Sequence, residues 1–242
     1  MNKNTINNFI INYYENDIVI GKTISDGHLW GSEIKHLFKK YYRPNSNILD
    51  IGGFIGTVSL VLSEVINKDY KIYVFEPQYY DCLIKNIKDN KLEDVIIPYN
   101  CGLSNINGNI PNNNIDINKT GNYGGQHLTK LYDKDLNTYL VEKGENTIEL
   151  KRLDDFEFEK IGLIKLDVEG FELLVLQGGI ETIKKSNYPP IFIEIWDTEC
   201  WRNKDNTREF YKKNKNNIIN FLFNLNYKIE WKKNCDYIFI HK

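Results

Sequence analysis

Acidic residues that follow short apolar runs are the side chains of this chain best placed to do chemistry. Asp50 ends one such run and is followed by Gly52 and Gly56, and Glu76 ends the next run. Glu76 lies 20 residues beyond Gly56, close to the spacing of about 20 residues at which an acid ending the second strand of a βαβ unit meets ribose hydroxyls. The spacing predicts a cofactor that carries a nucleoside.

The glycine pattern argues against the dinucleotide form of such a site. A dinucleotide fingerprint needs glycine at positions 54 and 57 so that the backbone can approach a pyrophosphate, but Phe54 and Thr57 stand there. The Asp50 carboxylate would repel a pyrophosphate and suits an ammonium group. S-adenosylmethionine carries an ammonium group, a sulfonium and a ribose but no phosphate, so we predict it as the cofactor, with Asp50 on the amine and Glu76 on the ribose. The predicted cofactor contacts are Asp50, Gly52, Gly53, Phe54, Gly56, Glu76, Pro77 and Asn100.

A second acidic group lies in the segment 161–179. Asp167 and Glu169 end an apolar run, and Glu172 falls in the first turn of the helix predicted next. A helix dipole stabilises a carboxylate at the helix N-terminus, which accounts for Glu172 alone. Asp167 and Glu169 need another reason, because ligands of open α/β sheets bind beyond the carboxyl ends of the strands. We expect both to face the sulfonium and the methyl acceptor.

Short apolar runs that alternate with helical patterns must position these acids, and this alternation is typical of a parallel sheet covered on both faces. The hydrophobic period predicts helices over 57–66, 79–90 and 172–185. The predicted strands are 47–51, 71–75, 95–99, 163–168, 191–196, 227–231 and 237–241.

The last two predicted strands are separated by residues 232–236 only, which indicates a hairpin, so one of them runs antiparallel. The predicted fold class is α/β: a Rossmann-like class I methyltransferase, with a seven-stranded, mostly parallel sheet, a C-terminal antiparallel hairpin and helices on both faces. We expect one domain over 1–242. It would include an N-terminal helical or lid segment, 1–45, and an Asn- and Gly-rich insertion, 103–146, which is either a substrate lid or surface decoration.

Composition excludes several partners. The net charge is -2, so no global positive field attracts nucleic acid, and no apolar run approaches the ~18 residues of a membrane span. The first eight residues are polar and lack the pattern of a secretory signal, and we interpret them as a frayed start. The four cysteines show no metal or disulfide spacing, so we expect reduced thiols and a cytoplasmic protein. No pattern indicates an oligomeric state.

The sequence resembles the FkbM family of S-adenosylmethionine-dependent methyltransferases. The specific part of the resemblance is the block Lys165-x-Asp-x-Glu-Gly-x-Glu172, and the segments 49–56, 75–77 and 152–155 support it. The resemblance extends over about residues 18–196. It implies that the segment 27–33 closes over the cofactor. Phe54 stands where the family often has Asn, which implies that a polar contact in the loop is absent.

The resemblance also implies a hydroxyl acceptor on a sugar, a glycan or another small molecule, because that acceptor class is common in the family. In-line methyl transfer gains most from holding the two reacting atoms at attack distance, and a hydroxyl also needs a proton acceptor. We favour Asp167 or Glu169 as the catalytic base, with Glu194 on the adjoining strand in support. His127 is a further candidate.

Three alternatives remain open. The three acids could instead hold a divalent cation that lowers the pKa of the hydroxyl, although we assign no metal ligands. The chain could be a catalytically idle module that binds S-adenosylmethionine and serves as a scaffold or partner subunit, or it could be a nicotinamide oxidoreductase. The tryptophans Trp30, Trp196 and Trp201 either form a wall for the acceptor or belong to the core.

Overall fold

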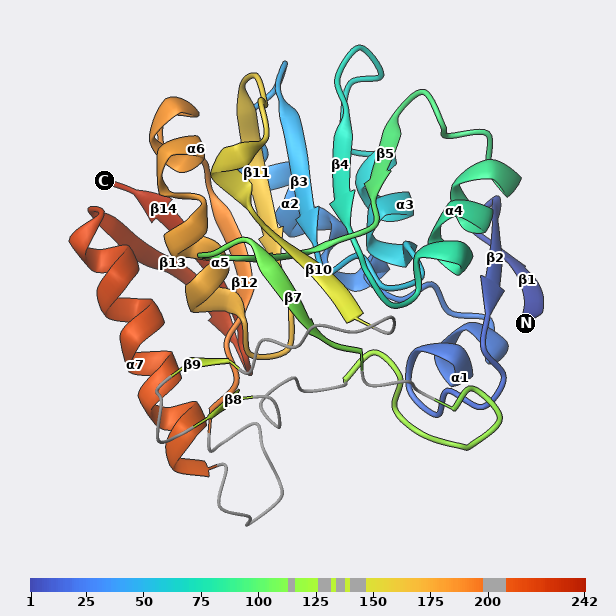
Figure 1. Cartoon of the computed structure of the whole chain (residues 1–242). Helices are drawn as coiled ribbons and strands as arrows, with labels where there is room; N and C mark the ends of the chain where they lie inside the picture. The colour runs from blue at the N-terminus through green and yellow to red at the C-terminus, as the bar shows by residue number, and fades with distance from the viewer. Residues whose placement is uncertain (113–115, 126–131, 134–137, 140–146, 198–207) are drawn as a thin grey trace.

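The computed structural model describes residues 1–112, 116–125, 132–133, 138–139, 147–197 and 208–242 (Figure 1). Its centre is a sheet of seven strands in the order β13-β14-β12-β11-β3-β4-β5. These strands are β3 (Asn47–Ile51), β4 (Ile72–Phe75), β5 (Ile96–Tyr99), β11 (Ile161–Leu166), β12 (Ile191–Glu194), β13 (Tyr227–Lys233) and β14 (Asp236–His241). Every strand predicted from the sequence is present.

The pairing within this sheet confirms the predicted fold class. From β12 to β5 all neighbouring strands pair in parallel, whereas β14 pairs antiparallel with both β12 and β13. The predicted hairpin near the C-terminus therefore places its second strand, β14, inside the sheet. Because the parallel strands share one direction, their carboxyl ends lie along a single edge of the sheet.

Helices cover both faces of the sheet (Figure 1). Adjacent residues of a strand point to opposite faces, so Ile48 packs with the helices of one face and Leu49 with those of the other. The first face carries α1 (Ile20–Ser25), η1 (Ser32–Ile34), α2 (Lys35–Tyr41), α3 (Thr57–Ser63) and α4 (Tyr80–Asp89). The second carries α5 (Glu172–Gly178), α6 (Ile180–Lys185) and α7 (Arg208–Asn224). None of the helices within the described ranges is both long enough and apolar enough to cross a membrane.

The helix predicted over 172–185 is wrong in one respect, because it is divided into α5 and α6 at Gly179. A Cβ atom at Gly178 would lie 2.0 Å from the Ser104 carbonyl oxygen, and one at Gly179 would lie 2.7 Å from the Leu153 Cδ2 atom. Both glycines thus allow neighbouring chain to approach closely. The hydrophobic period continues across the break, which explains why the sequence pattern predicted one helix.

The insertion predicted over 103–146 contributes to a second, smaller sheet. Its strands, in the order β6-β10-β7, are β6 (Gly102–Ser104), β7 (Gly108–Pro111) and β10 (Thr147–Arg152), followed by η3 (Leu153–Asp155). A separate pair joins β8 (Tyr132–Asp133) and β9 (Thr138–Tyr139). Ile110 and Ile148 are buried in the same core cluster as α5, so this sheet packs on the second face of the molecule. Its role as a lid stays a prediction.

The N-terminus is not frayed, as the sequence had suggested, but forms a β-hairpin. Strands β1 (Asn2–Ile6) and β2 (Phe9–Tyr13) pair antiparallel with Ile6 opposite Phe9. Both linking residues, Asn7 and Asn8, have positive φ angles of 52° and 71°, as a two-residue type I′ turn requires, and Asn tolerates this region better than most residues. The asparagine pair was therefore a turn signal rather than a sign of disorder.

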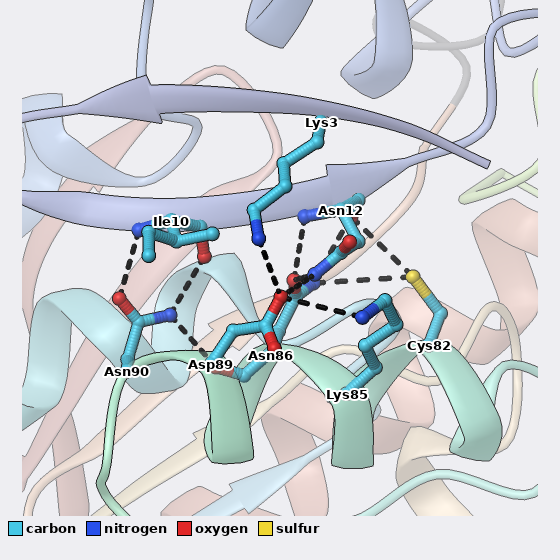
Figure 2. Close-up of polar contacts among 8 residues, drawn as sticks. All are labelled: Lys3, Ile10, Asn12, Cys82, Lys85, Asn86, Asp89 and Asn90. Carbon is cyan, nitrogen blue, oxygen red and sulfur yellow. Dashed lines mark hydrogen bonds and ion pairs between the residues drawn. The ribbon is translucent and has the colours of Figure 1, made fainter.

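The hairpin is joined to α4 by a buried amide network (Figure 2). The Asn86 Oδ1 atom accepts hydrogen bonds from the Asn12 backbone N at 2.6 Å and from its Nδ2 at 2.9 Å. The Asn86 Nδ2 atom donates to the Asn12 carbonyl at 3.0 Å and to the Ile55 carbonyl at 2.7 Å. Ile55 belongs to the turn after β3, so one side chain connects the N-terminus to the predicted cofactor loop.

The oxidation state of one cysteine differs from the prediction. Cys82 and Cys101 are free and buried, and burial raises the pKa of Cys82 to about 12 and that of Cys101 to about 11. Both are therefore inert thiols near neutral pH. Cys235 is disulfide-bonded, so the expectation of four reduced thiols is wrong at this residue.

Candidate active site

A cavity opens at the carboxyl ends of the central strands, where α/β sheets bind ligands. Its walls come from the turns after β3 and β4, from the end of β11, and from the small sheet formed by β6, β7 and β10. The two acidic groups predicted from the sequence therefore meet at one cavity. The predicted residues that line it are Gly52, Gly53, Phe54, Glu76, Pro77, Asp167 and Glu169.

Packing accounts for the glycines of the turn after β3. Gly52 has a φ of +83°, and a Cβ atom there would lie 1.7 Å from the Asp167 carbonyl oxygen. Gly53 has no such φ, but its Cβ atom would lie 2.2 Å from the Val74 Cγ1 atom. Gly56 begins α3 at a φ of +89° and lies outside the cavity lining. Glycine at these positions lets the turn lie directly against β4 and the end of β11.

Glu76 is buried and holds the same turn through its carboxylate. Its Oε2 atom accepts a hydrogen bond from the Phe54 backbone N at 2.9 Å, and its Oε1 atom accepts from the backbone N atoms of Gln78 at 2.6 Å and Tyr79 at 2.9 Å. Burial raises the pKa of Glu76, and these hydrogen bonds oppose the rise. A carboxylate oxygen has two lone pairs, so Glu76 keeps acceptor capacity toward the cavity. Contact with ribose hydroxyls stays a prediction.

Asp50 does not line the cavity, and the predicted contact with the cofactor amine has no support in its position. Its side chain is 0% exposed and points to the face of the sheet covered by α3. There its Oδ2 atom accepts a hydrogen bond from the Ser59 hydroxyl at 2.5 Å, and its Oδ1 atom lies 3.4 Å from the Lys165 Nζ atom. Asn100, which like Gly56 also lies outside the lining, is exposed.

The three acids that the sequence nominates as catalytic residues, Asp167, Glu169 and Glu194, form one acidic cluster. One carboxylate oxygen from each lies within 4.8 Å of the others. Leu166 of β11 pairs with Ile193 of β12, so the residues that follow, Asp167 and Glu194, emerge side by side. Asp167 and Glu169 line the cavity, whereas Glu194 lies outside its lining.

The cluster holds protons more strongly than isolated carboxyls do. Burial, together with the nearby Asp167 charge, raises the pKa of Glu169 and of Glu194 well above the usual range, and a hydrogen bond with Asp167 contributes at Glu194. A carboxylate with a raised pKa is a stronger base once it is ionised. The cluster therefore has the chemistry needed to accept a proton from an acceptor in the cavity.

Asp236 belongs to the same acidic region and was missed by the sequence reasoning. It opens β14 directly opposite Glu194, and burial together with the Asp167 and Glu33 charges raises its pKa to about 6. The signal available was its place in the predicted hairpin, because pairing of that hairpin with β12 brings its first residue to Glu194.

Three clustered carboxylates are also oxygen ligands of the kind that divalent cations prefer. Here, however, the Lys165 Nζ atom lies 3.6 Å from the Asp167 Oδ2 atom. An ammonium group at this distance already supplies a positive charge to the cluster. The donor set thus suits a proton-accepting role at least as well as a cation site.

Aromatic side chains form another wall of the cavity. Trp30, Phe54, Tyr79 and Tyr123 line it, and the Tyr79 hydroxyl donates to the Tyr123 carbonyl at 3.1 Å. Trp196 instead donates from Nε1 to the Glu194 Oε2 atom at 3.0 Å and lies outside the lining. The remaining candidates, His127 and Trp201, lie outside the described residues.

The chain is similar in sequence to known proteins. A family model described as "Methyltransferase FkbM domain" matches residues 50–229. The protein "Methyltransferase sdnD" of Sordaria araneosa is 32% identical over 159 residues, which cover 55% of this chain and 60% of that protein. The chain therefore spans less than two thirds of the length of this curated relative.

Solved structures also resemble the chain. A methyltransferase FkbM from Methylobacillus flagellatus aligns over 85% of this chain and 49% of its own, with a TM-score of 0.47 and 16% identity. A Staphylococcus aureus protein with a proposed caffeoyl-CoA O-methyltransferase activity aligns over 88% of this chain and 82% of its own, with a TM-score of 0.50 and 12% identity. At 12% identity, the match to the Staphylococcus aureus protein shows a similar fold and nothing more.

Proposed function

Because the chain belongs to the FkbM family of S-adenosylmethionine-dependent methyltransferases, we propose that it methylates a hydroxyl group of a sugar, a glycan or another small molecule. The observation that carries this proposal is one cavity lined both by the glycine turn with Glu76 and by the acids Asp167 and Glu169. A cofactor side and a proton-accepting side thus share one space. O-methylation requires both.

The residues present suit the cofactor. S-adenosylmethionine supplies an electrophilic methyl group on a sulfonium. Glu76 lines the cavity and can accept a hydrogen bond from a ribose hydroxyl, because its Oε2 atom accepts only one backbone hydrogen bond and keeps a lone pair. Asp167 lines the same cavity and adds a carboxylate, which favours a cation there. The aromatic wall at Phe54 and Tyr79 restricts water at the site.

The acidic cluster accounts for the proton. An acceptor hydroxyl placed against Asp167 or Glu169 would give its proton to one of these carboxylates, and Glu194 would share it through its hydrogen bond with Asp167. The cluster then releases the proton to water, because Asp167 is 36% exposed. Most of the rate enhancement would come from holding the two reacting atoms together.

The test combines cofactor binding with turnover. We expect isothermal titration calorimetry to show that the protein binds S-adenosylhomocysteine. We also expect transfer of a labelled methyl group from S-adenosylmethionine to at least one member of a panel of sugars and small hydroxylated acceptors. Binding without any transfer would favour the idle module, and binding of NAD in place of S-adenosylhomocysteine would favour the oxidoreductase.

The catalytic assignment makes a separate prediction. Asp167→Asn and Glu169→Gln keep the size and polarity of the side chains but remove their charge, so each should lower turnover about 100-fold or more. The affinity for S-adenosylhomocysteine should change little, because neither residue is assigned to the ribose or the turn. Glu157→Gln, at an exposed acid outside the cavity, is the matched control. Full activity of both variants would exclude Asp167 and Glu169 as bases.

A further inference from the structure

Lys165 is a buried cation between the two halves of the proposed site. Its side chain is 5% exposed. Among the residues whose burial the structure describes, no other lysine is buried. A buried ammonium group is costly unless its charge and its hydrogen bonds are satisfied. Its position therefore needs an account beyond packing.

Three contacts satisfy the ammonium group, and they come from both sides of the cavity. The Nζ atom donates to the Gly52 carbonyl at 2.6 Å, lies 3.4 Å from the Asp50 Oδ1 atom and lies 3.6 Å from the Asp167 Oδ2 atom. Gly52 belongs to the turn after β3, and Asp167 ends β11. Lys165 therefore connects the cofactor turn directly to the acid on the acceptor side.

The sheet register explains why this connection forms. β3 and β11 are parallel neighbours, and Lys165 lies directly opposite Asp50. Both side chains point to the same face of the sheet, and Asp167, two residues after Lys165, points there as well. Asp50 has no other described ion pair and accepts one further hydrogen bond, from Ser59, so its charge is directed at the lysine.

The geometry assigns Lys165 as a positioning residue, which holds the Gly52 turn and the Asp167 carboxylate in one fixed arrangement. This inference rests on the proposed function, and it gives Asp50 a different task from the one predicted. Asp50 secures the ammonium group of Lys165 rather than that of the cofactor. Burial alone would lower the pKa of Lys165, but the Asp50 and Asp167 carboxylates outweigh burial and raise the pKa, so the side chain stays charged.

The test compares variants in which no buried charge is left alone. Asp50→Asn keeps the Lys165 contacts with Gly52 and Asp167, whereas Asp50→Asn with Lys165→Met removes the buried pair and keeps the volume of the lysine stem. Asp167 is partly exposed, so solvent can screen its charge in the double variant. Lys165→Arg keeps the charge and serves as the conservative variant. Urea unfolding establishes that each variant folds.

We expect the double variant to bind S-adenosylhomocysteine at least about tenfold more weakly than Asp50→Asn does, because the turn is no longer tied to β11. Its kcat for methyl transfer should fall by a larger factor than its KM for S-adenosylmethionine rises, since Asp167 is displaced from the acceptor. Lys165→Arg should exceed the double variant, which carries Lys165→Met, in both affinity and turnover. A residue that only fills space would give the reverse order, because Met matches the lysine stem more closely.

The outcomes separate this inference from the proposed function. If Asp50→Asn and the double variant have equal affinity for S-adenosylhomocysteine while the native protein binds it, Lys165 is not a positioning residue and the proposed function stands. If the native protein does not bind S-adenosylhomocysteine, the proposed function fails and the inference falls with it. If no acceptor of the panel is methylated, the S-adenosylhomocysteine affinities of Asp50→Asn and the double variant alone test the role of Lys165.

Discussion

Glu76 shows at the residue scale how one side chain can serve both the fold and the site. Its carboxylate accepts three backbone hydrogen bonds that shape the turns after β3 and β4, and it faces the cavity. Glu76→Ala should therefore weaken S-adenosylhomocysteine binding by about 1.5 to 3 kcal/mol and also lower the free energy of unfolding by about 1 to 3 kcal/mol. Calorimetric titration and urea unfolding measure the two effects.

The exposed Glu93 is the control for this prediction, because it makes no ion pair among the described residues. Glu93→Ala should change neither quantity by more than about 0.5 kcal/mol. A Glu76→Ala variant with native affinity would remove Glu76 from the cofactor site. Loss of stability in the same variant would show that the three backbone hydrogen bonds to Glu76 stabilise the fold.

Glu172 makes a prediction about pH. It is buried, and its Oε1 atom accepts hydrogen bonds from the backbone N atoms of Val168 and Gly170, which fixes the turn that carries Glu169. Burial raises its pKa from 4.5 to about 7. Because the folded pKa is the higher one, this group's contribution to stability is complete below pH 4.5, falls as the pH rises, and is lost above about 7.

Glu172→Gln keeps the accepting oxygen and removes the ionisation. Its free energy of unfolding should match that of the native protein at pH 4 and exceed it at pH 8 by about 3 kcal/mol. Urea unfolding at the two pH values checks this, and other buried acids such as Asp236 cancel in the comparison. Equal stability at pH 8 would mean that Glu172 titrates normally.

At the scale of elements, the N-terminal hairpin depends on the amide network at α4 (Figure 2). Asn86 is 0% exposed and makes four hydrogen bonds with Asn12 and Ile55. Asn86→Ala removes the side-chain partner of the Asn12 backbone N and of the Ile55 carbonyl, so the free energy of unfolding should fall by about 2 to 4 kcal/mol. Asn90→Ala, at a partly buried site that bonds Ile10, should cost only about 1 kcal/mol. If the two variants lose similar amounts of stability, the buried Asn86 hydrogen bonds contribute no more than those of Asn90.

The elements also show what the sequence could predict. All seven strands of the main sheet were predictable. The parallel strands are buried and give short, mainly apolar runs such as 47–51 and 191–194, whereas the antiparallel pair β13 and β14 was indicated by its short connection. The N-terminal hairpin was not predicted, since its strands are polar at exposed positions and its turn uses Asn7 and Asn8 rather than glycine. The division of α5 from α6 was also missed, because close approach by Ser104 is a tertiary contact.

The candidate site was predictable in its membership but less so in its geometry. Spacing placed Glu76, Asp167 and Glu169 at one edge of the sheet, because the carboxyl ends of parallel strands meet there, and the three residues line one cavity. Spacing alone does not tell which face of a strand a side chain occupies at its last residues. For this reason Asp50 was assigned to the cofactor, whereas it lies beneath the turn with Lys165. Asp236 was missed because β14 inserts next to β12 only in the folded sheet.

At the scale of the whole molecule, the site joins parts of the chain that are far apart in sequence. The cavity lining runs from Ile20 to Phe171 and draws on both faces of the central sheet. Such a site is assembled only when the whole domain is folded, and a ligand that bridges its walls stabilises all of them together. Ligand-dependent unfolding is therefore the most general measure of the proposed function.

S-adenosylhomocysteine at about 100 times its Kd should raise the free energy of unfolding by about 2.7 kcal/mol. For a chain of 242 residues this corresponds to a rise in Tm of about 5 to 10 °C, measurable by scanning calorimetry. NAD at the same concentration should give no shift, because Phe54 and Thr57 occupy the positions where a pyrophosphate needs glycine. Glu76→Ala should reduce the rise seen with S-adenosylhomocysteine at that fixed concentration, since its Kd is higher. A shift with NAD would instead mean that the turn after β3 accepts a pyrophosphate without glycine at positions 54 and 57, and would contradict S-adenosylmethionine as the cofactor.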